Sequence, residues 1–203
     1  MKQFRKIWPK SILAIGLFLS CFSVNAQNSL IGRDFIFSVL GAKPAPGEKS
    51  ITFITIAAAY PDTQKGKVYL DIPATGASQV FEFNGRLSQA PVGWGYEVDE
   101  KTFAGIEEGK DGFSIHIQSE IDVTVLLTKH FEGENYNHGD ATMVLPIREL
   151  GTQYYVMSHN EIDAEYNSEL VVVATEDNTY VDIIPSADTR AHAAGFPLTI
   201  KLN

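Results

Sequence analysis

The chain has 203 residues, of which 44% are hydrophobic and 20% are charged. This balance is typical of one globular domain with a substantial core, and it excludes disordered, collagen-like and multi-span membrane chains. Four of the 16 basic residues fall in the first ten positions, so the rest of the chain carries 12 basic against 25 acidic residues, a formal charge of −13. Such a charge repels phosphate backbones and anionic lipid, which excludes nucleic-acid binding.

The first 26 residues have the three parts of a secretory signal peptide. A basic start is followed by an apolar run over residues 12–19 and by the small-residue site Val24-Asn25-Ala26. The run is shorter than the ~20 residues that span a bilayer, so we expect cleavage after Ala26 and no transmembrane segment afterwards. A retained anchor and a lipid attached at Cys21 are the alternatives, although Phe18 fits a lipobox poorly.

Export also limits how the fold is held together. Cys21 is the only cysteine, so cleavage leaves 177 residues that contain no disulfide and depend on their core alone. We therefore predict a secreted or cell-surface protein.

Beyond Gln27 the side-chain period is close to two, which predicts an all-β chain. The first strands expected are 32–37, 53–57, 68–72 and 81–84, and residues 97–108 are considered for one short helix. Apolar and polar residues then alternate over 113–118 and 121–125 on either side of Ser119-Glu120. We interpret these two runs as a half-buried antiparallel hairpin.

The C-terminal part predicts two further strands. Leu170–Ala174 is a continuous apolar run, which favours a strand covered on both faces. Asp177 and Asn178 tolerate left-handed backbone, and the run 180–184 that follows them is stopped by Pro185. We interpret these segments as a second tight hairpin.

The sequence also indicates an internal repeat. Residues 32–37 resemble 151–156 and residues 81–84 resemble 200–203, both at an offset of 119 residues. Between them, 53–57 resembles 170–174, and 68–73, which ends in a proline, resembles 180–185. These matches predict one repeat unit over 32–150 and a partial second unit over 151–203.

The partial unit lacks a counterpart of the 113–128 strands. We therefore expect an open strand edge that favours self-association, and one interpretation is that the chain is a truncated piece of a larger surface protein. The predicted fold class is an antiparallel β-sandwich of repeated hairpins. A propeller-like array of four-stranded units is the alternative.

Residues 103–200 carry a family resemblance, and residues 32–84 share it more loosely. The segments that carry it read FAGIE at 103–107, GFSIHI at 112–117, DVTV at 122–125, DATMVLP at 140–146, LGTQYYVMS at 150–158, VATEDNTYV at 173–181 and AGFPLTI at 194–200. Together they resemble the IgGFc-binding protein N-terminal domain, a family of one vertebrate mucus protein and many exported bacterial proteins. The resemblance implies an extracellular binding domain, and the family has no agreed catalytic residues.

Motifs of catalysis and metal binding are weak or absent. A phosphate loop, a dinucleotide fingerprint and a nucleophile elbow all fail on spacing. His130, His138 and Asp140 flank a predicted loop and are considered for a metal, and Glu176 and Asp177 for calcium. Solvated loop and turn residues explain both sets, so we predict no catalytic residue, no metal and no cofactor.

Trp94 and Tyr96 are the candidate ligand-binding residues. Trp94 is the only Trp after the signal peptide, and it stands between two glycines in a segment that we interpret as an exposed loop. Aromatic side chains of this kind anchor protein or glycan partners. The alternative is a Trp folded back to close the end of the sandwich.

These observations lead to one functional prediction with two alternatives. The prediction is an exported, non-catalytic binding or adhesion module whose partner is an unknown protein or glycan at the cell surface. An extracellular hydrolase acting on glycans is the first alternative, and a structural spacer is the second. Exposed aromatic side chains favour the binding module, whereas convergent carboxylates in a cleft favour the hydrolase.

Overall fold

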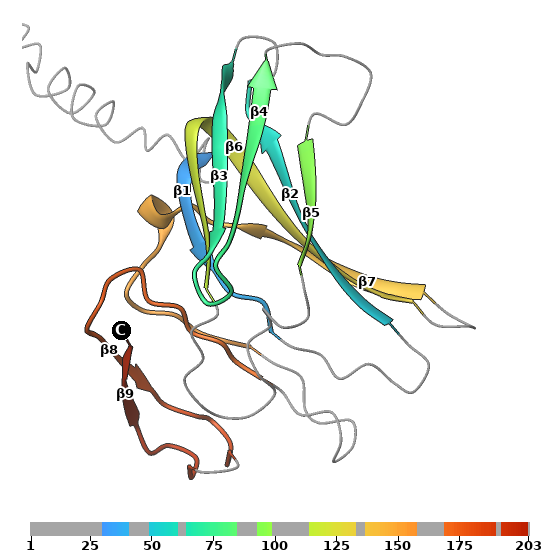
Figure 1. Ribbon diagram of the computed structural model, residues 1–203. Coiled ribbons are helices and arrows are strands. Elements are labelled where there is room, and N and C mark those ends of the chain that lie inside the picture. Colours follow the sequence, from blue (N-terminus) through green and yellow to red (C-terminus); the bar gives the residue numbers. More distant parts are fainter. Residues whose placement is uncertain are drawn as a thin grey trace, which may run out of the picture.

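The computed structural model describes residues 30–40, 49–60, 64–84, 93–98, 114–132, 137–157, 169–189 and 192–202. These residues form antiparallel strands with almost no helix, which confirms the predicted all-β class and is consistent with a sandwich (Figure 1). The strands are β1 Gly32–Phe37, β2 Lys49–Ala58, β3 Lys65–Ile72, β4 Ala77–Asn84, β5 Gly93–Val98, β6 Ile115–Glu132, β7 Asn137–Val144, β8 Thr179–Ile183 and β9 Leu198–Leu202. A 3₁₀ turn, η3, covers Ile147–Glu149.

Strand β6 is 18 residues long and organises the main sheet, because its two halves have different neighbours. The first half pairs with β3 along one edge and with β1 along the other. The second half pairs with β2 and β7. Strand β4 pairs with the other edge of β3, and β5 pairs with the other edge of β2. One four-stranded layer is therefore β4-β3-β6-β1 and the other is β5-β2-β6-β7, and β6 bends from one layer into the other (Figure 1).

The two layers bury one common core. Ile117 pairs with Leu70 on one side and with Phe35 on the other, and all three side chains are fully buried. Directly opposed residues share a face of the sheet, so each such row presents a continuous apolar surface. The second half repeats this arrangement, because Val125 pairs with both Ile56 and Val144. All of these side chains belong to a single hydrophobic cluster, which places the core between the layers.

The bend of β6 lies at Ser119–Asp122, and here side chains replace the missing ladder bonds. Ser119 Oγ donates to the carbonyl of Ile121 at 2.6 Å and accepts from its amide at 3.2 Å. The Glu120 carboxylate accepts the Lys67 amide at 2.9 Å and the Tyr69 hydroxyl at 3.1 Å. These side chains therefore give the backbone groups of Ile121 and Lys67 hydrogen-bond partners where the strand changes layer.

The predicted hairpin over residues 113–125 is wrong, because β6 runs through Ser119-Glu120 without reversing. In a hairpin closed by these two residues, Ile117 would face Asp122, and an apolar side chain would share a face with a carboxylate. In the continuous strand, Ile115, Ile117, Ile121, Val123 and Val125 all fall on the buried face. The unbroken phase of the alternation is the signal that distinguishes the two structures.

The C-terminal expectations are corrected in part. No strand is assigned to 170–174, and Leu170 is exposed, so the predicted covered strand and its hairpin with 180–184 are wrong. Strand β8 pairs instead with β9, which lies 15 residues further along the chain. The predicted turn does form: Asn178 has a φ of 62°, and the Thr179 hydroxyl donates to the Glu176 carbonyl at 2.7 Å. The prediction of a strand at β8 is thus correct, but the strand pairs with β9 and not with residues 170–174.

Two other predictions fall partly on described residues. Of the segment considered for a helix, Glu97 and Val98 lie in β5, and 99–108 lies outside the described residues. Of the predicted repeat, β3–β4 and β8–β9 are both antiparallel pairs, whereas 151–156 is not assigned as a strand as β1 is. The duplication stays a prediction.

We predict that Gly66→Ala destabilises the fold by about 1–3 kcal/mol, because the bend of β6 has no room for another atom. A Cβ at this position would lie 2.7 Å from Ile121 Cγ2 and 3.2 Å from Glu120 Cβ. Urea unfolding of the exported protein measures the effect. Gly151→Ala is the matched control, since its added Cβ meets nothing closer than 4.0 Å. Equal unfolding midpoints for the two variants would contradict the close packing at the bend.

A second prediction concerns Tyr69, whose pKa is raised above its ordinary value chiefly by the hydrogen bond to Glu120. A raised folded-state pKa means that the bond stabilises the neutral phenol. Its contribution to folding is complete below the ordinary tyrosine pKa and is lost as pH rises through the raised value. We expect Glu120→Ala to lower the pKa of Tyr69, as followed by NMR titration of labelled tyrosine rings.

Glu82→Ala is the control for that titration, because Glu82 raises the pKa of Tyr69 only through its charge and ranks last among the causes. An equal change in both variants would mean that general charge, and not the hydrogen bond at the bend, holds the phenol neutral.

Candidate functional site

The structure places Trp94 and Tyr96 on strand β5, so the expectation of a loop at this segment is wrong. In the ladder with β2, Trp94 lies opposite Ile56 and Tyr96 lies opposite Ile54, and both isoleucines are fully buried. The neighbouring glycines suggested a loop, but β2 supplies an edge that an extended glycine-containing segment can join. The role of Trp94 and Tyr96 in ligand binding stays a prediction.

The residues considered for metals lie in paired strands and in a turn. β6 extends to Glu132 and β7 begins at Asn137, so the predicted loop between His130 and His138 is shorter than expected. His130 pairs in register with Gly139, and Lys129 pairs with Asp140. Within the described ranges, no three His, Cys, Asp or Glu side chains are grouped closely enough to hold a metal ion.

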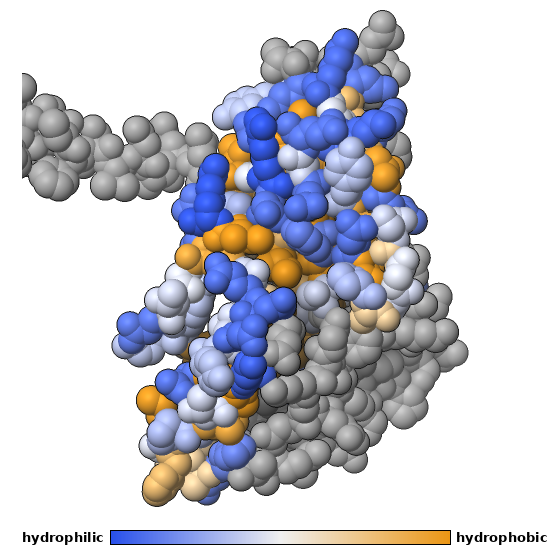
Figure 2. Space-filling view, turned by 60° about the vertical axis from the view of Figure 1, so that its left-hand side comes forward, coloured by the Kyte–Doolittle hydropathy of each residue, from blue (hydrophilic) through white to orange (hydrophobic). Residues whose placement is uncertain are grey.

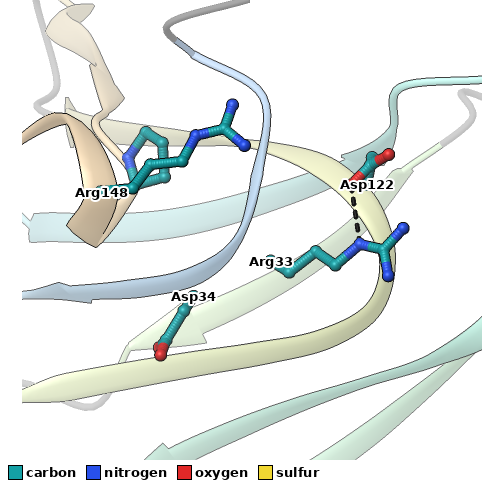
Figure 3. Close-up of a pocket in the computed structure, with 5 residues that line it drawn as sticks. Arg33, Asp34, Asp122 and Arg148 are labelled. Carbon is teal, nitrogen blue, oxygen red and sulfur yellow. Dashed lines mark hydrogen bonds and ion pairs between the residues drawn. The ribbon is translucent and has the colours of Figure 1, made fainter.

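An open depression lies where β1, the bend of β6 and η3 meet (Figure 3). Its volume is about 270 Å³, close to the lower limit for a small-molecule site. Its walls are formed by Arg33, Asp34, Asp122, Pro146 and Arg148. Pro146 packs directly over Gly32, where an added Cβ would lie 2.4 Å from the proline Cβ. The depression is thus a junction between elements that are packed against each other.

The charged groups of the depression are paired with each other or with the backbone. Arg33 Nε donates to Asp122 Oδ1 at 2.7 Å, and this hydrogen bond raises the pKa of Arg33 (Figure 3). His116 Nε2 lies 2.6 Å from Asp34 Oδ1, and the His116 side chain is half-buried.

Arg148 joins η3 to the segment before β1. Its Nη2 donates to the Ile31 carbonyl at 2.7 Å and its Nε to Glu149 Oε1 at 3.2 Å. The charged side chains of the depression therefore tie β1 to β6 and to η3. Chemically this is a polar network that orients elements, because each of its two aspartates is already engaged by a neighbouring side chain.

Large apolar side chains are exposed in another part of the chain. Met157 is 95% exposed and Tyr155 is 91% exposed, and Tyr180 and Phe196 each reach 70%. In Figure 2 hydrophobic residues reach the surface at the lower end of the visible face, where Figure 1 places β8 and β9. Exposed tyrosine and methionine side chains present apolar area that a partner can bury.

Comparison with known proteins connects this region to a family. The family model described as IgGFc binding protein matches residues 140–203. This segment is IgGFc-binding-like. The match confirms the resemblance for the C-terminal third of the chain.

Other comparisons add little. No curated protein matches the chain. Among solved structures, the crystal structure of Thermotoga maritima 1070 aligns with 56% of this chain and 92% of its own, at 17% identity and a TM-score of 0.34. A likeness of this size carries no argument about function.

The IgGFc-binding-like segment contains the exposed apolar side chains. Among the described residues, the seven large hydrophobics that are exposed by 60% or more all lie within it: Tyr154, Tyr155, Val156, Met157, Tyr180, Ile184 and Phe196. The sequence predicts Tyr154–Val156 only as part of the partial repeat and does not single these residues out as exposed. The available signal was the run Tyr154–Met157 itself, whose apolar residues do not alternate with polar ones as those of β6 do.

Proposed function

We propose that this protein is an exported, non-catalytic binding module that recognises a protein partner at the cell surface or in the extracellular space. The observation that carries the proposal is the concentration of exposed apolar side chains in the IgGFc-binding-like segment. Export rests on the signal-peptide pattern of residues 1–26. No helix among the described residues is long and apolar enough to cross a membrane.

Tyr155 and Met157 are the strongest candidates for contact residues. Their side chains are more than nine-tenths exposed, and leaving such apolar area in water costs free energy that a partner recovers on binding. Tyrosine also combines a large rigid surface with a hydroxyl that hydrogen-bonds at an interface edge. A run of four apolar residues, Tyr154–Met157, extends the area along the chain.

Protein rather than glycan is favoured by the family and by the chemistry of the surface. The name of the matching family records the binding of a protein, the Fc part of an antibody, although that particular partner is not carried over here. Methionine and valine in the exposed run offer apolar contacts, which are flexible in the case of methionine and suit protein surfaces better than sugars. In the depression, Asp34 and Asp122 are held by His116 and Arg33, which argues against their use as the acid pair of a glycan hydrolase.

We predict that a Tyr155→Ser/Met157→Ser variant binds its partner at least about tenfold more weakly, because truncating central apolar contacts typically costs more than 1 kcal/mol. The measurement is flow cytometry, with the labelled exported protein titrated onto intact cells of the producing organism. Val80→Ser is the matched control, since Val80 is 53% exposed but lies on β4, outside the IgGFc-binding-like segment.

Treatment of the cells identifies the class of partner. The proposal expects saturable binding that is lost after the cell surface is digested with trypsin and retained after periodate oxidation of its glycans. Loss of binding after periodate alone would contradict a protein partner. Equal weakening by the double variant and by Val80→Ser would contradict the assigned contact residues.

A further inference from the structure

Among the described residues, no further strand pairs with either outer edge of the β8–β9 hairpin. Within the described residues β8 pairs only with β9, and neither strand makes another backbone hydrogen bond. An isolated two-stranded ribbon is marginally stable in water, and its outer backbone groups offer a template for another strand. The edges of this hairpin, which are unpaired among the described residues, are a separate observation from the exposed side chains of Tyr154–Met157.

The two edges differ in their protection. Strand β9 carries Lys201 as its fourth residue of five, and lysine is a residue that natural proteins use to block edge-to-edge pairing. Strand β8 carries no lysine. Its one charged residue, Asp182, is already bound by the Thr199 hydroxyl at 2.5 Å within the hairpin. The β8 edge is therefore the open one.

The sequence of β8 is complementary to a second copy of itself. In an antiparallel pair centred on Val181, Val181 faces Val181, Thr179 faces Ile183, and Tyr180 faces Asp182. Half-buried residues then meet half-buried residues on one face, and phenol hydroxyls meet carboxylates on the other. Shifting the centre to Asp182 would oppose two like charges, and a shift that pairs odd with even positions would place apolar against polar side chains.

We infer that the partner of the β8 edge is a second copy of this chain. Two hairpins join through their β8 strands, centred on Val181, to form a four-stranded antiparallel sheet in the order β9-β8-β8-β9. The arrangement is two-fold symmetric, so each copy contributes the same surface, and it closes after two chains. The Tyr180 ring, which lies 5.9 Å from Lys201 Nζ, remains on the polar face of this sheet.

Cysteine cross-linking tests the inference, since Cys21 is the only natural cysteine and is replaced by serine in both variants. Val181→Cys places two thiols directly opposite each other at the centre of the pairing, within the range of a disulfide. Ile200→Cys is the matched control: it is half-buried, lies opposite Val181 on β9, and is separated from its symmetry mate by about 14 Å, three strand spacings.

The protein is recovered after export from cells that express the full chain, oxidised mildly and examined on non-reducing gels. We expect at least about tenfold more covalent dimer for Val181→Cys than for Ile200→Cys. More dimer for Ile200→Cys would assign the interface to β9 and overturn the inference, as would equal amounts for both variants. Sedimentation of the natural chain supplies a second measurement, because a monomer at concentrations on the order of 100 μM would also overturn it.

Discussion

Strand β6 passes from one layer of the sandwich to the other at the bend Ser119–Asp122, and the rest of the main sheet depends on the side-chain hydrogen bonds that hold this bend. The ladder with β1 shifts its register there, between Gly32 and Asp34, and the ladder with β3 ends at Ser119. Side-chain hydrogen bonds connect the strands at this point. The Glu120 carboxylate accepts the Lys67 amide of β3, and the Asp122 carboxylate accepts Arg33 Nε of β1. Ile121 meanwhile stays buried and keeps the core continuous through the bend.

The same bend explains the nature of the polar depression. Arg33 and Asp122 line it because they hold β1 against the bend, and Arg148 lines it because η3 is fastened to Ile31. Charged residues with these structural partners are poorly placed for chemistry on a substrate. In the C-terminal region the exposed apolar residues and the family match coincide, and this is the surface that we propose for recognition. On this proposal β6 builds the scaffold and the IgGFc-binding-like segment carries the recognition surface.

The sequence predicts features that depend on neighbouring residues better than features that depend on distant ones. The alternation around Ile117 and Val123 correctly indicates a half-buried sheet, and Asn178 correctly indicates left-handed backbone. Whether Ser119-Glu120 turns the chain or only bends it depends on partners more than 30 residues away on β1 and β3, which local propensity does not contain. For the same reason Leu170–Ala174 has the composition of a strand but is not assigned as one.

The candidate site follows the same division. Trp94 was singled out for its flanking glycines, yet the ladder with β2 sets its backbone conformation. The sequence does not single out Tyr155 and Met157, because an exposed apolar run and a buried one have the same composition. What separates them is whether another strand covers the run, which is decided by the whole fold.

Long-range NMR contacts of β6 test the central claim most directly. A continuous strand shared by two layers predicts cross-strand nuclear Overhauser effects from Ile117 to both Phe35 and Leu70, and from Val125 to both Ile56 and Val144. It also predicts no contact between His116 and Val123, which lie seven residues apart on one strand. A strong effect between His116 and Val123 would show that the chain reverses at Ser119-Glu120, and would contradict this account of the fold.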